Sequence, residues 1–347
     1  MPATADSSFE TPRTLGVVVI GRNEGERLRR CLSSVAGSRA KIVYVDSGST
    51  DESAALARSM NVEVVDLDLS IPFTAARARN EGFARLTDHD DTIAYVQFVD
   101  GDCELAVDWL SNAVAAIEPA RDLAIVCGRL QERFPEQSVY NRICAVEWNG
   151  PVGEIAACGG IFMIRASEFK KVGGFDPAII AAEDDDLCLR VRGNGGKVIR
   201  IDRPMAWHDA AMTRVSQWWR RAVRCGFAFA QISSLHGKGP FRHFVHETRS
   251  TWMWGFFIPV AIVVLAVLTR GWALLAFPVL YLFAAYRIAG NERLRELSPG
   301  MRWAYATHCL ASKFPQVVGQ VKFWWRRAWN APSVIIEHKD AGRKLSK

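Results

Sequence analysis

Upstream of residue 235, short apolar runs alternate with stretches of helical periodicity. The runs LGVVVI (15–20) and KIVYVD (41–46) are rich in β-branched residues, which favours strands. The runs VEVVDL (62–67) and IAYVQFVD (93–100) continue the series, with helix-like segments such as EGERLRRCLSSV between them. Because strands and helices take turns, the pattern predicts an α/β domain with a mostly parallel central sheet flanked by helices.

Two long apolar runs follow this domain. WMWGFFIPVAIVVLAVLT (252–269) and GWALLAFPVLYLFAAY (271–286) contain no charged residue, and only Arg270 separates them. Each is close to the roughly 17 to 25 residues that a helix needs to cross a membrane. They predict a transmembrane hairpin at 252–286; the alternatives are a buried helical pair and a re-entrant hairpin. Arginines on both flanks place its two ends on the cytoplasmic side (Arg242, Arg249, Arg287, Arg293).

The segment after the hairpin, MRWAYATHCLASKFPQVVGQVKFWWRRAW (301–329), mixes apolar and basic residues at helical spacing. It predicts an amphipathic basic segment at the membrane interface, or a plain amphipathic core helix, broken or kinked at Pro315. We therefore divide the chain into a disordered polar lead (1–13), an α/β domain (14–235) and a helical membrane-associated region (236–347).

Composition and charge support a membrane surface as a partner. The chain is 49% hydrophobic with 12 Trp, its net charge is +6, and runs such as FWWRRAW place tryptophan beside arginine. Indoles at headgroup level and cations facing anionic lipid explain this pairing, and no nucleic-acid partner is expected. Eight scattered cysteines without CxxC spacing suggest neither a zinc site nor a disulfide framework. We expect a catalytic domain that faces the cytosol at the inner (cytoplasmic) membrane.

Polar residues follow the predicted strands, as GRNEGE, DSGSTDES and DGD. In a parallel sheet, ligands bind outside the carboxyl ends of the strands. Asp46, at a strand end, is placed to accept hydrogen bonds from a base or ribose, whereas helix capping alone explains Asp51. The absence of GxGxxG and GxxxxGK[ST] gives no support to a dinucleotide site or a P-loop.

Asp100 and Asp102 lie on either side of Gly101 directly after an apolar run. Two acids at this spacing can approach one hard cation, which would take phosphate oxygens as further ligands. An isolated DxD is usually a surface turn, but its place at a strand end favours a metal site.

The ordered set VVVIGRNEGERLRRCLSSV, VYVDSGSTDES, ARARNEGF, FVDGD, CGGIFMIRASEFKKVGGFDP and EDDDLCLRV resembles the family-2 glycosyltransferases of GT-A fold, from Leu15 to about Gln231. The resemblance implies a nucleotide-binding sheet and a divalent ion, Mn²⁺ or Mg²⁺. It implies that Asp102 holds the ion as part of a DxD pair with Asp100. It also assigns donor-nucleotide contacts to Asp46 and Asp51, the diphosphate to Arg79, and the first nucleotide-facing loop to Asn23 and Glu24.

Four consecutive acids, Glu183 to Asp186, open a predicted helix. The helix dipole explains one or two of them, and crowding raises the pKa of at least one, which suits a general base. The resemblance implies that Asp184 is the general base, that Glu183 supports it, and that Asp186 faces away from the site. Displacement by a hydroxyl opposite the leaving diphosphate inverts the anomeric centre.

Three further features have two interpretations each. Gly159 and Gly160 leave room for a bound sugar or acceptor, or are turn residues. His208 resembles a histidine that contacts the metal or diphosphate, or is structural. QWWRR resembles the QxxRW motif of processive synthases but has Arg221 where tryptophan is expected. Gln217, Arg220 and Arg221 are therefore assigned to the acceptor and sugar pocket, and single-sugar addition is favoured.

The sequence thus predicts a membrane-associated, metal-dependent, inverting glycosyltransferase. It would take a UDP-linked sugar and a lipid-linked or glycan acceptor in surface polysaccharide or glycolipid assembly. Two alternatives stay open. A sugar nucleotidyltransferase should carry a Gly-rich basic loop, of which GRNEGE is a poor version, and a catalytically silent scaffold would not need both DGD and ED.

Overall fold

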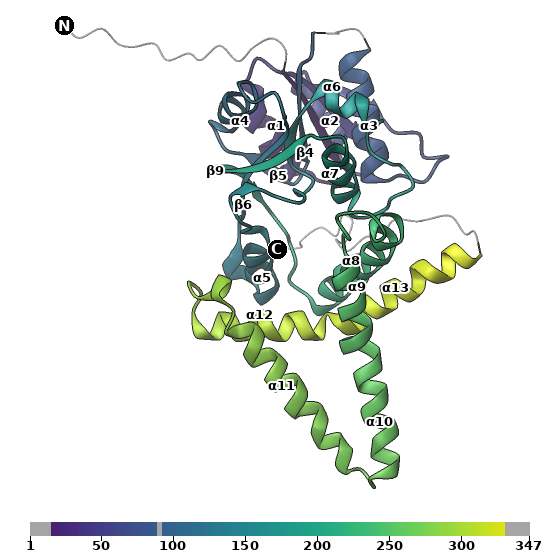
Figure 1. Cartoon of the computed structure of the whole chain (residues 1–347). Helices are drawn as coiled ribbons and strands as arrows, with labels where there is room; N and C mark the ends of the chain where they lie inside the picture. Colours follow the sequence, from purple (N-terminus) through teal and green to yellow (C-terminus); the bar gives the residue numbers. More distant parts are fainter. Residues whose placement is uncertain (1–14, 89–91, 330–347) are drawn as a thin grey trace, which may run out of the picture.

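In residues 15–88 and 92–329, which the computed structural model describes, nine strands form one mixed sheet (Figure 1). In spatial order they are β3 (Glu63–Asp66), β2 (Lys41–Asp46), β1 (Leu15–Gly21), β4 (Tyr95–Asp100), β8 (Phe162–Arg165), β6 (Leu123–Glu132), β9 (Lys197–His208) and β5 (Cys103–Leu105), and β7 (Gly153–Glu154) pairs with β9. The expected lead at 1–13 lies outside the described residues, as does the chain beyond 329.

The first half of the sheet is the parallel part. β1 pairs in parallel with β2 and β4, and β2 with β3, so the four predicted strands and their alternation with helices are confirmed. Leu15 and Val17 to Val19 are fully buried because helices cover both faces of the sheet, which explains their continuous apolar run. The helices of this part are α1 (Glu26–Ala36), α2 (Ser53–Ser59), α3 (Ala75–Thr87) and α4 (Trp109–Ile117).

The second half of the sheet is mixed and brings distant segments to the β4 end. β8 runs antiparallel to β4 with Phe98 opposite Phe162, and β9 runs antiparallel to β5 with Cys103 opposite His208. The intervening helices are α5 (Val139–Trp148), α6 (Ala166–Lys171) and α7 (Glu183–Gly193). Both pairings place residues from the second half of the domain beside the DGD turn.

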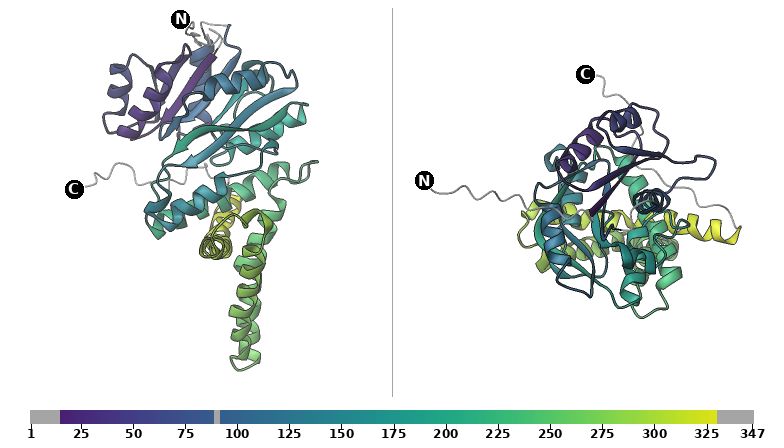
Figure 2. Two further views of the ribbon diagram at one scale, coloured as in Figure 1. Left: turned by 90° about the vertical axis from the view of Figure 1, so that its left-hand side faces the viewer. Right: turned by 90° about the horizontal axis from the view of Figure 1, so that it is seen from above.

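A helical region follows the sheet domain and lies at the other end of the molecule (Figure 2). It comprises α8 (Val215–His236), α9 (Val245–Trp252), a π-helical turn (Met253–Phe257), α10 (Ile258–Leu268), α11 (Ala276–Ala289), α12 (Pro299–Ala311) and α13 (Lys313–Ala328). The predicted break near Pro315 is present, because α12 ends at Ala311 and α13 begins at Lys313. Pro315 lies in the first turn of α13, where its missing N–H leaves no hydrogen bond unmade.

The hairpin predicted at 252–286 protrudes from the body as two helices (Figure 1). Two continuous helical spans, Val245–Leu268 and Trp272–Ala289, are long and apolar enough to cross a membrane. Only 11% and 17% of their most apolar windows are buried. Large side chains along both spans are exposed, including Val263, Leu268, Val279 and Phe283. This exposure is unlike that of helices buried in a soluble core.

Helices α8 and α13 cross at backbone contact, and two glycines make the contact possible. A Cβ on Gly226 would lie 2.0 Å from the carbonyl oxygen of Gln316, and one on Gly319 would lie 2.0 Å from that of Val223. The obstructing atoms are backbone, so neither helix can yield by a rotamer change. This crossing joins α8, which precedes α9 and the hairpin, to the last described helix after the hairpin.

We expect Gly226→Ala and Gly319→Ala each to lower the free energy of unfolding by about 1 to 3 kcal/mol, because an added methyl forces the helices apart. The matched control is Gly193→Ala, where a Cβ meets no atom within 4 Å. Since alanine is the better helix former, the control should be neutral or slightly stabilising. Thermal unfolding of the purified chains in detergent measures the difference, and equal shifts for all three variants would contradict the proposed close crossing.

Candidate active site

The loops after β1 and β2 hold each other in place. The Asn23 side chain accepts a hydrogen bond from the Thr50 backbone N–H at 2.7 Å, and the Asn23 N–H donates to Ser49 Oγ at 2.9 Å. Asn23 has a positive φ of 58°, a conformation that asparagine tolerates better than most residues. Glu24 follows and pairs with Arg27 at 2.9 Å. The nucleotide-facing loop expected from Asn23 and Glu24 is thus built around Asn23.

The Asp46 carboxylate is occupied by its own loop. It accepts hydrogen bonds from the Tyr44 hydroxyl (2.9 Å), the Gly48 N–H (3.0 Å), the Ser49 N–H (2.7 Å) and the Ser49 hydroxyl (2.6 Å). Asp51 is exposed, and its carboxylate accepts from the N–H of Ser53 at the start of α2, at 3.0 Å. These contacts shape the loop, and the expected nucleotide contacts of Asp46 and Asp51 stay predictions.

Arg79 of α3 lies buried between two acids. Its guanidinium contacts Asp100 at 2.8 Å and Glu183 at 2.6 Å, and only 2% of the residue is exposed. Burial opposes the charge, but the two carboxylates outweigh burial and raise the pKa of Arg79. A Cβ on Gly160 would lie 2.3 Å from Arg79 Nη2. Gly160, which precedes β8, therefore makes room for the guanidinium.

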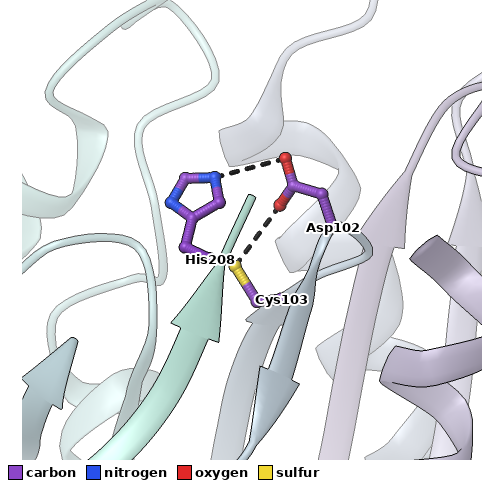
Figure 3. A group of neighbouring side chains, drawn as sticks. All are labelled: Asp102, Cys103 and His208. Carbon is purple, nitrogen blue, oxygen red and sulfur yellow. Dashed lines mark hydrogen bonds and ion pairs between the residues drawn. The ribbon is translucent and has the colours of Figure 1, made fainter. Parts of the chain in front are cut away.

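Asp102 and His208 form a possible metal site (Figure 3). The β5–β9 pairing brings His208 Nε2 within 3.2 Å of Asp102 Oδ2, although the residues are 106 positions apart. Burial lowers the pKa of His208, so its neutral ring keeps a lone pair for a metal ion. The ring also stacks on Trp148 with the centroids 4.5 Å apart, which fixes its plane.

Cys103 lies close enough to belong to the same cluster. Its Sγ, a carboxylate oxygen of Asp102 and a ring nitrogen of His208 lie within 4.8 Å of one another. Burial raises the pKa of the Cys103 thiol well above its usual value, so the thiol stays protonated and donates to Asp102 Oδ1 at 3.3 Å. Carboxylate and imidazole suit Mn²⁺ or Mg²⁺ better than a thiol does. The fit to a divalent ion therefore rests on Asp102 and His208.

The four acids at the start of α7 have different partners. Glu183 pairs with Arg79, Asp185 with His243 at 2.7 Å, and Asp186 with Arg190 and His236 at 2.6 and 2.7 Å. Among the described residues, only Asp184 of the four has no basic side chain within salt-bridge distance. The expectation that Asp186 faces away from the site agrees with its contacts.

A residue with a strained backbone lies two positions before Asp184. Ala182, directly before α7, has a left-handed φ of 62°, a conformation that alanine rarely adopts. Burial is the first cause that raises the pKa of Asp184 well above its usual value, followed by the charges of Asp185 and Glu183. The sequence predicted that crowding by the neighbouring acids would raise this pKa. Those acids do contribute, but less than burial does. Burial also acts on Glu183, but Arg79 and Arg224 bring its pKa below the usual value.

Two cavities meet at this point. The strand-end cavity, of about 330 Å³, is lined by Glu24, Arg79, Asp100, Asp102, Gly160 and Glu183, among others, but not by Asn23, Asp46 or Asp51 of the described chain. The helix-side cavity, of about 380 Å³, is lined by residues of α5, α8 and the start of α9, including Trp148, Met212, Arg221, Phe229 and Phe244. Ala182, Asp184, His208 and Arg224 line both cavities.

The three residues of the QWWRR segment that were assigned to the acceptor and sugar pocket lie in different surroundings. Gln217 is buried and caps α8, because its Oε1 accepts from the N–H groups of Thr213 and Arg214 at 2.9 and 3.0 Å. Arg220 donates to the Ser216 carbonyl at 3.3 Å and lines neither cavity. Arg221 does line the helix-side cavity, where it pairs with Glu147 at 2.7 Å.

Arg224 was not found from the sequence. It lies three residues after Arg221 on α8, and it is the cation that reaches the junction of the two cavities. The signal was present in WWRRAVR, because residues three apart share a helix face. A Cβ on Gly159 would lie 4.0 Å from Asp184 Oδ2, and its expected place in a sugar or acceptor pocket stays a prediction.

Comparison with known proteins gives two family matches. The profile "Glycosyl transferase family 2" matches residues 16–160, and "N-terminal domain of galactosyltransferase" matches residues 141–214. Together they cover the β1, β2 and β4 ends, Gly160, Asp184 and His208. The matched segments thus contain both halves of the site.

Curated relatives are distant. The pre-mycofactocin glycosyltransferase of Mycobacterium tuberculosis is 26% identical over 241 residues, which is 65% of this chain and 48% of that protein. Glycosyltransferase AglE of Haloferax volcanii is 26% identical over 184 residues, 49% of this chain and 58% of that protein. The succinoglycan biosynthesis protein ExoA of Rhizobium meliloti is 25% identical over 228 residues, 62% and 69%. This chain therefore spans about half the length of the mycobacterial relative.

A solved structure shares the fold. Mannosyltransferase PcManGT of Pyrobaculum calidifontis, in complex with GDP-Man and Mn²⁺, has a TM-score of 0.62 and 21% identity, with 90% of this chain and 88% of that chain covered. The sheet order, the two matched profiles and this likeness agree with one another. Residues 16–160 therefore resemble glycosyltransferase family 2, and the fold of the described chain is GT-A-like.

Proposed function

We propose that this protein is a membrane-associated, metal-dependent glycosyltransferase that moves a sugar from a UDP-linked donor to a hydroxyl with inversion. The supporting observation is the junction of the two cavities. His208, the partner of Asp102, lines both cavities together with Asp184, the one acid of its group without a basic partner among the described residues. A metal site and a base are what the reaction needs at neighbouring positions.

The donor would lie in the strand-end cavity with its diphosphate toward Asp102 and His208. A divalent ion held by these two residues would stabilise the charge on the departing diphosphate. Arg224 adds a positive charge on the far side of the junction. Arg79 is neutralised by Asp100 and Glu183, so we assign it to positioning these acids, with a role toward the diphosphate kept as a proposal.

The acceptor would enter from the helix-side cavity. Asp184 takes the proton of the acceptor hydroxyl, the oxygen bonds to the anomeric carbon, and the bond from that carbon to the diphosphate oxygen breaks. Because attack comes from the side opposite the leaving group, the configuration inverts. Arg221 lines this cavity, and the apolar wall formed by Phe229 and Phe244 suits the lipid of a lipid-linked acceptor. Gly159 leaves space beside Asp184, since a Cβ there would lie 4.0 Å from Asp184 Oδ2.

Membrane attachment would come from the hairpin. The spans Val245–Leu268 and Trp272–Ala289 have the length and exposure of inserted helices. Arginines gather at the base of the hairpin, whereas Arg270 alone lies at its tip, so the base faces the cytosol. The site would then face the cytosol at the inner membrane, with residues 14–235 as the catalytic domain, and surface polysaccharide or glycolipid assembly as the role.

The decisive experiment is a screen of UDP- and GDP-sugars, with Mn²⁺ or Mg²⁺, for transfer and hydrolysis by membranes that contain the protein. We expect Asp102→Asn and Asp184→Asn each to lower turnover by about 10² to 10⁴-fold, because one removes a metal ligand and the other the base. Asp108→Asn, an exposed acid at the start of α4, is the control and should keep parental turnover.

Parental turnover in either variant would contradict the assignment. Formation of a nucleotide-sugar from a nucleoside triphosphate and a sugar phosphate would instead identify a nucleotidyltransferase. No turnover or donor binding with any tested donor would favour the silent scaffold.

Asp184 and Glu183 are expected to have opposite effects on the stability of the fold. The pKa of Asp184 is raised in the folded state, so its charge destabilises the fold at every pH above its unfolded pKa of about 3.9. Asp184→Asn should therefore raise the melting temperature at neutral pH. Glu183 has a lowered pKa and stabilises the fold above its unfolded pKa, so Glu183→Gln should lower the melting temperature.

Thermal unfolding from pH 8 downward tests this pair. The gain of Asp184→Asn should shrink as the pH falls toward the unfolded pKa of aspartate, whereas the loss of Glu183→Gln should persist down to the unfolded pKa of glutamate and shrink only below it, as the pH falls through the lowered folded-state pKa. A destabilised Asp184→Asn variant would show that this carboxylate is structural.

Deletion of residues 252–286 should release the chain from membranes, because the exposed apolar surface is removed. The measurement is sedimentation with membranes before and after an alkaline carbonate wash. Continued sedimentation of the deleted chain would assign the attachment to the Trp- and Arg-rich α13 instead.

A further inference from the structure

Two adjoining cavities lie at the base of the hairpin, away from the reacting groups. One, of about 460 Å³, is lined by Arg242, Val245, His246, Arg249, Ser250, Met253 and Trp254. The other, of about 490 Å³, is lined by residues of α9, α11, α12 and α13, including Arg287 and Lys313. His246, Ser250 and Trp254 belong to both, so the two form one groove, which we call the basal groove. Its lining residues come from α9, α11, α12 and α13 and the turns beside them, and Figure 1 shows these helices meeting the hairpin at its base.

The basal groove carries cations without matching acids. Its walls hold Arg242, Arg249, Arg287 and Lys313 together with His246, and no carboxylate of the described chain lines either part. No salt bridge within 4.0 Å joins any of these four cations to an acid of the described residues. The nearest acid in sequence, Glu247 of α9, acts on Lys313 only as a weaker influence. Burial is the main cause that lowers the pKa of the Lys313 ammonium, so an anion would relieve this cation.

The groove also has an apolar side toward the hairpin. Along the first helix, His246 and Arg249 are followed by Met253 and Trp254, and along the second, Ala284 precedes Arg287 and Ile288. Met253 and Trp254 lie nearer the tip than Arg249, and Ala284 lies nearer the tip than Arg287, while Val245 and Ile288 line the groove on its body side. The exposed apolar surface of the two candidate spans continues from this side.

We propose that the basal groove binds the phosphate of a lipid headgroup at the membrane surface, with the acyl chains along the hairpin. This proposal rests on the membrane attachment proposed above. Cations at the cytoplasmic ends of inserted helices attract anionic lipids, and arginine suits phosphate because it donates two parallel hydrogen bonds. The apolar side favours a lipid over a soluble phosphate.

The test uses the full chain in nanodiscs of phosphatidylcholine with a minor share of phosphatidylglycerol. Phosphatidylglycerol retained by the protein after detergent extraction is measured by mass spectrometry. We expect the parent to retain it selectively. Arg249→Gln combined with Arg287→Gln should reduce retention by about 5-fold for each charge removed. Arg249→Lys with Arg287→Lys should keep most of it, which shows that the charge and not the fold was lost.

Arg295→Gln is the matched control, because it removes the same charge from an exposed site outside the groove and should have no effect. Equal losses in the control and the glutamine pair, or no selectivity in the parent, would overturn the proposal while leaving membrane insertion intact. A parent that does not enter nanodiscs would overturn both. Loss of selectivity in inorganic phosphate, but not in chloride of equal ionic strength, would assign the groove to soluble phosphate and overturn the lipid proposal.

Discussion

The site depends on one buried ionic contact, the guanidinium of Arg79 between Asp100 and Glu183. It joins α3, the end of β4 and the start of α7, which are far apart in the sequence. Desolvation of the Arg79 and Glu183 charges is costly, and the contact is favourable only when the geometry is good and both partners are present. Gly160 makes this geometry possible, because a side chain at that position would collide with the Arg79 guanidinium. The turn that carries Asp102 and the helix that carries Asp184 are thereby fixed relative to each other.

Asp184 shows how the fold tolerates a group that does not stabilise it. Its three acidic neighbours are each paired with a base, and those pairs hold the first turn of α7. Asp184 is left half-buried without such a partner, two residues after the strained Ala182. Strain and an unpaired buried charge are disfavoured unless the surrounding structure imposes them, and such features gather at functional sites. The proposed base is therefore the residue for which stability offers no explanation.

The sequence predicted what depends on local pattern. The strands β1, β2 and β4 were found because most of their residues are buried on both faces, and the acidic strand ends followed from the parallel arrangement. The Asp102–His208 contact needed the β5–β9 pairing, which no local pattern encodes. The motif suggested that Gln217 lies in the acceptor and sugar pocket, but its side chain caps α8. Capping depends on the directions of backbone N–H groups, which the motif does not reveal. Arg224 was not predicted because it lies about one helical turn after the end of the QWWRR motif.

The segment from Arg242 to Val245 connects the two parts of the molecule. Arg242 and Val245 line the basal groove, Phe244 lines the helix-side cavity, and His243 contacts Asp185, the neighbour of Asp184. Arg242 and Phe244 both have positive φ values, 46° and 55°, so the surrounding contacts hold this short wall in a strained form. A single short segment therefore contributes to both the basal groove and the helix-side cavity. Any displacement of α9 relative to the sheet domain must act on this wall, and through His243 on the acids beside the proposed base.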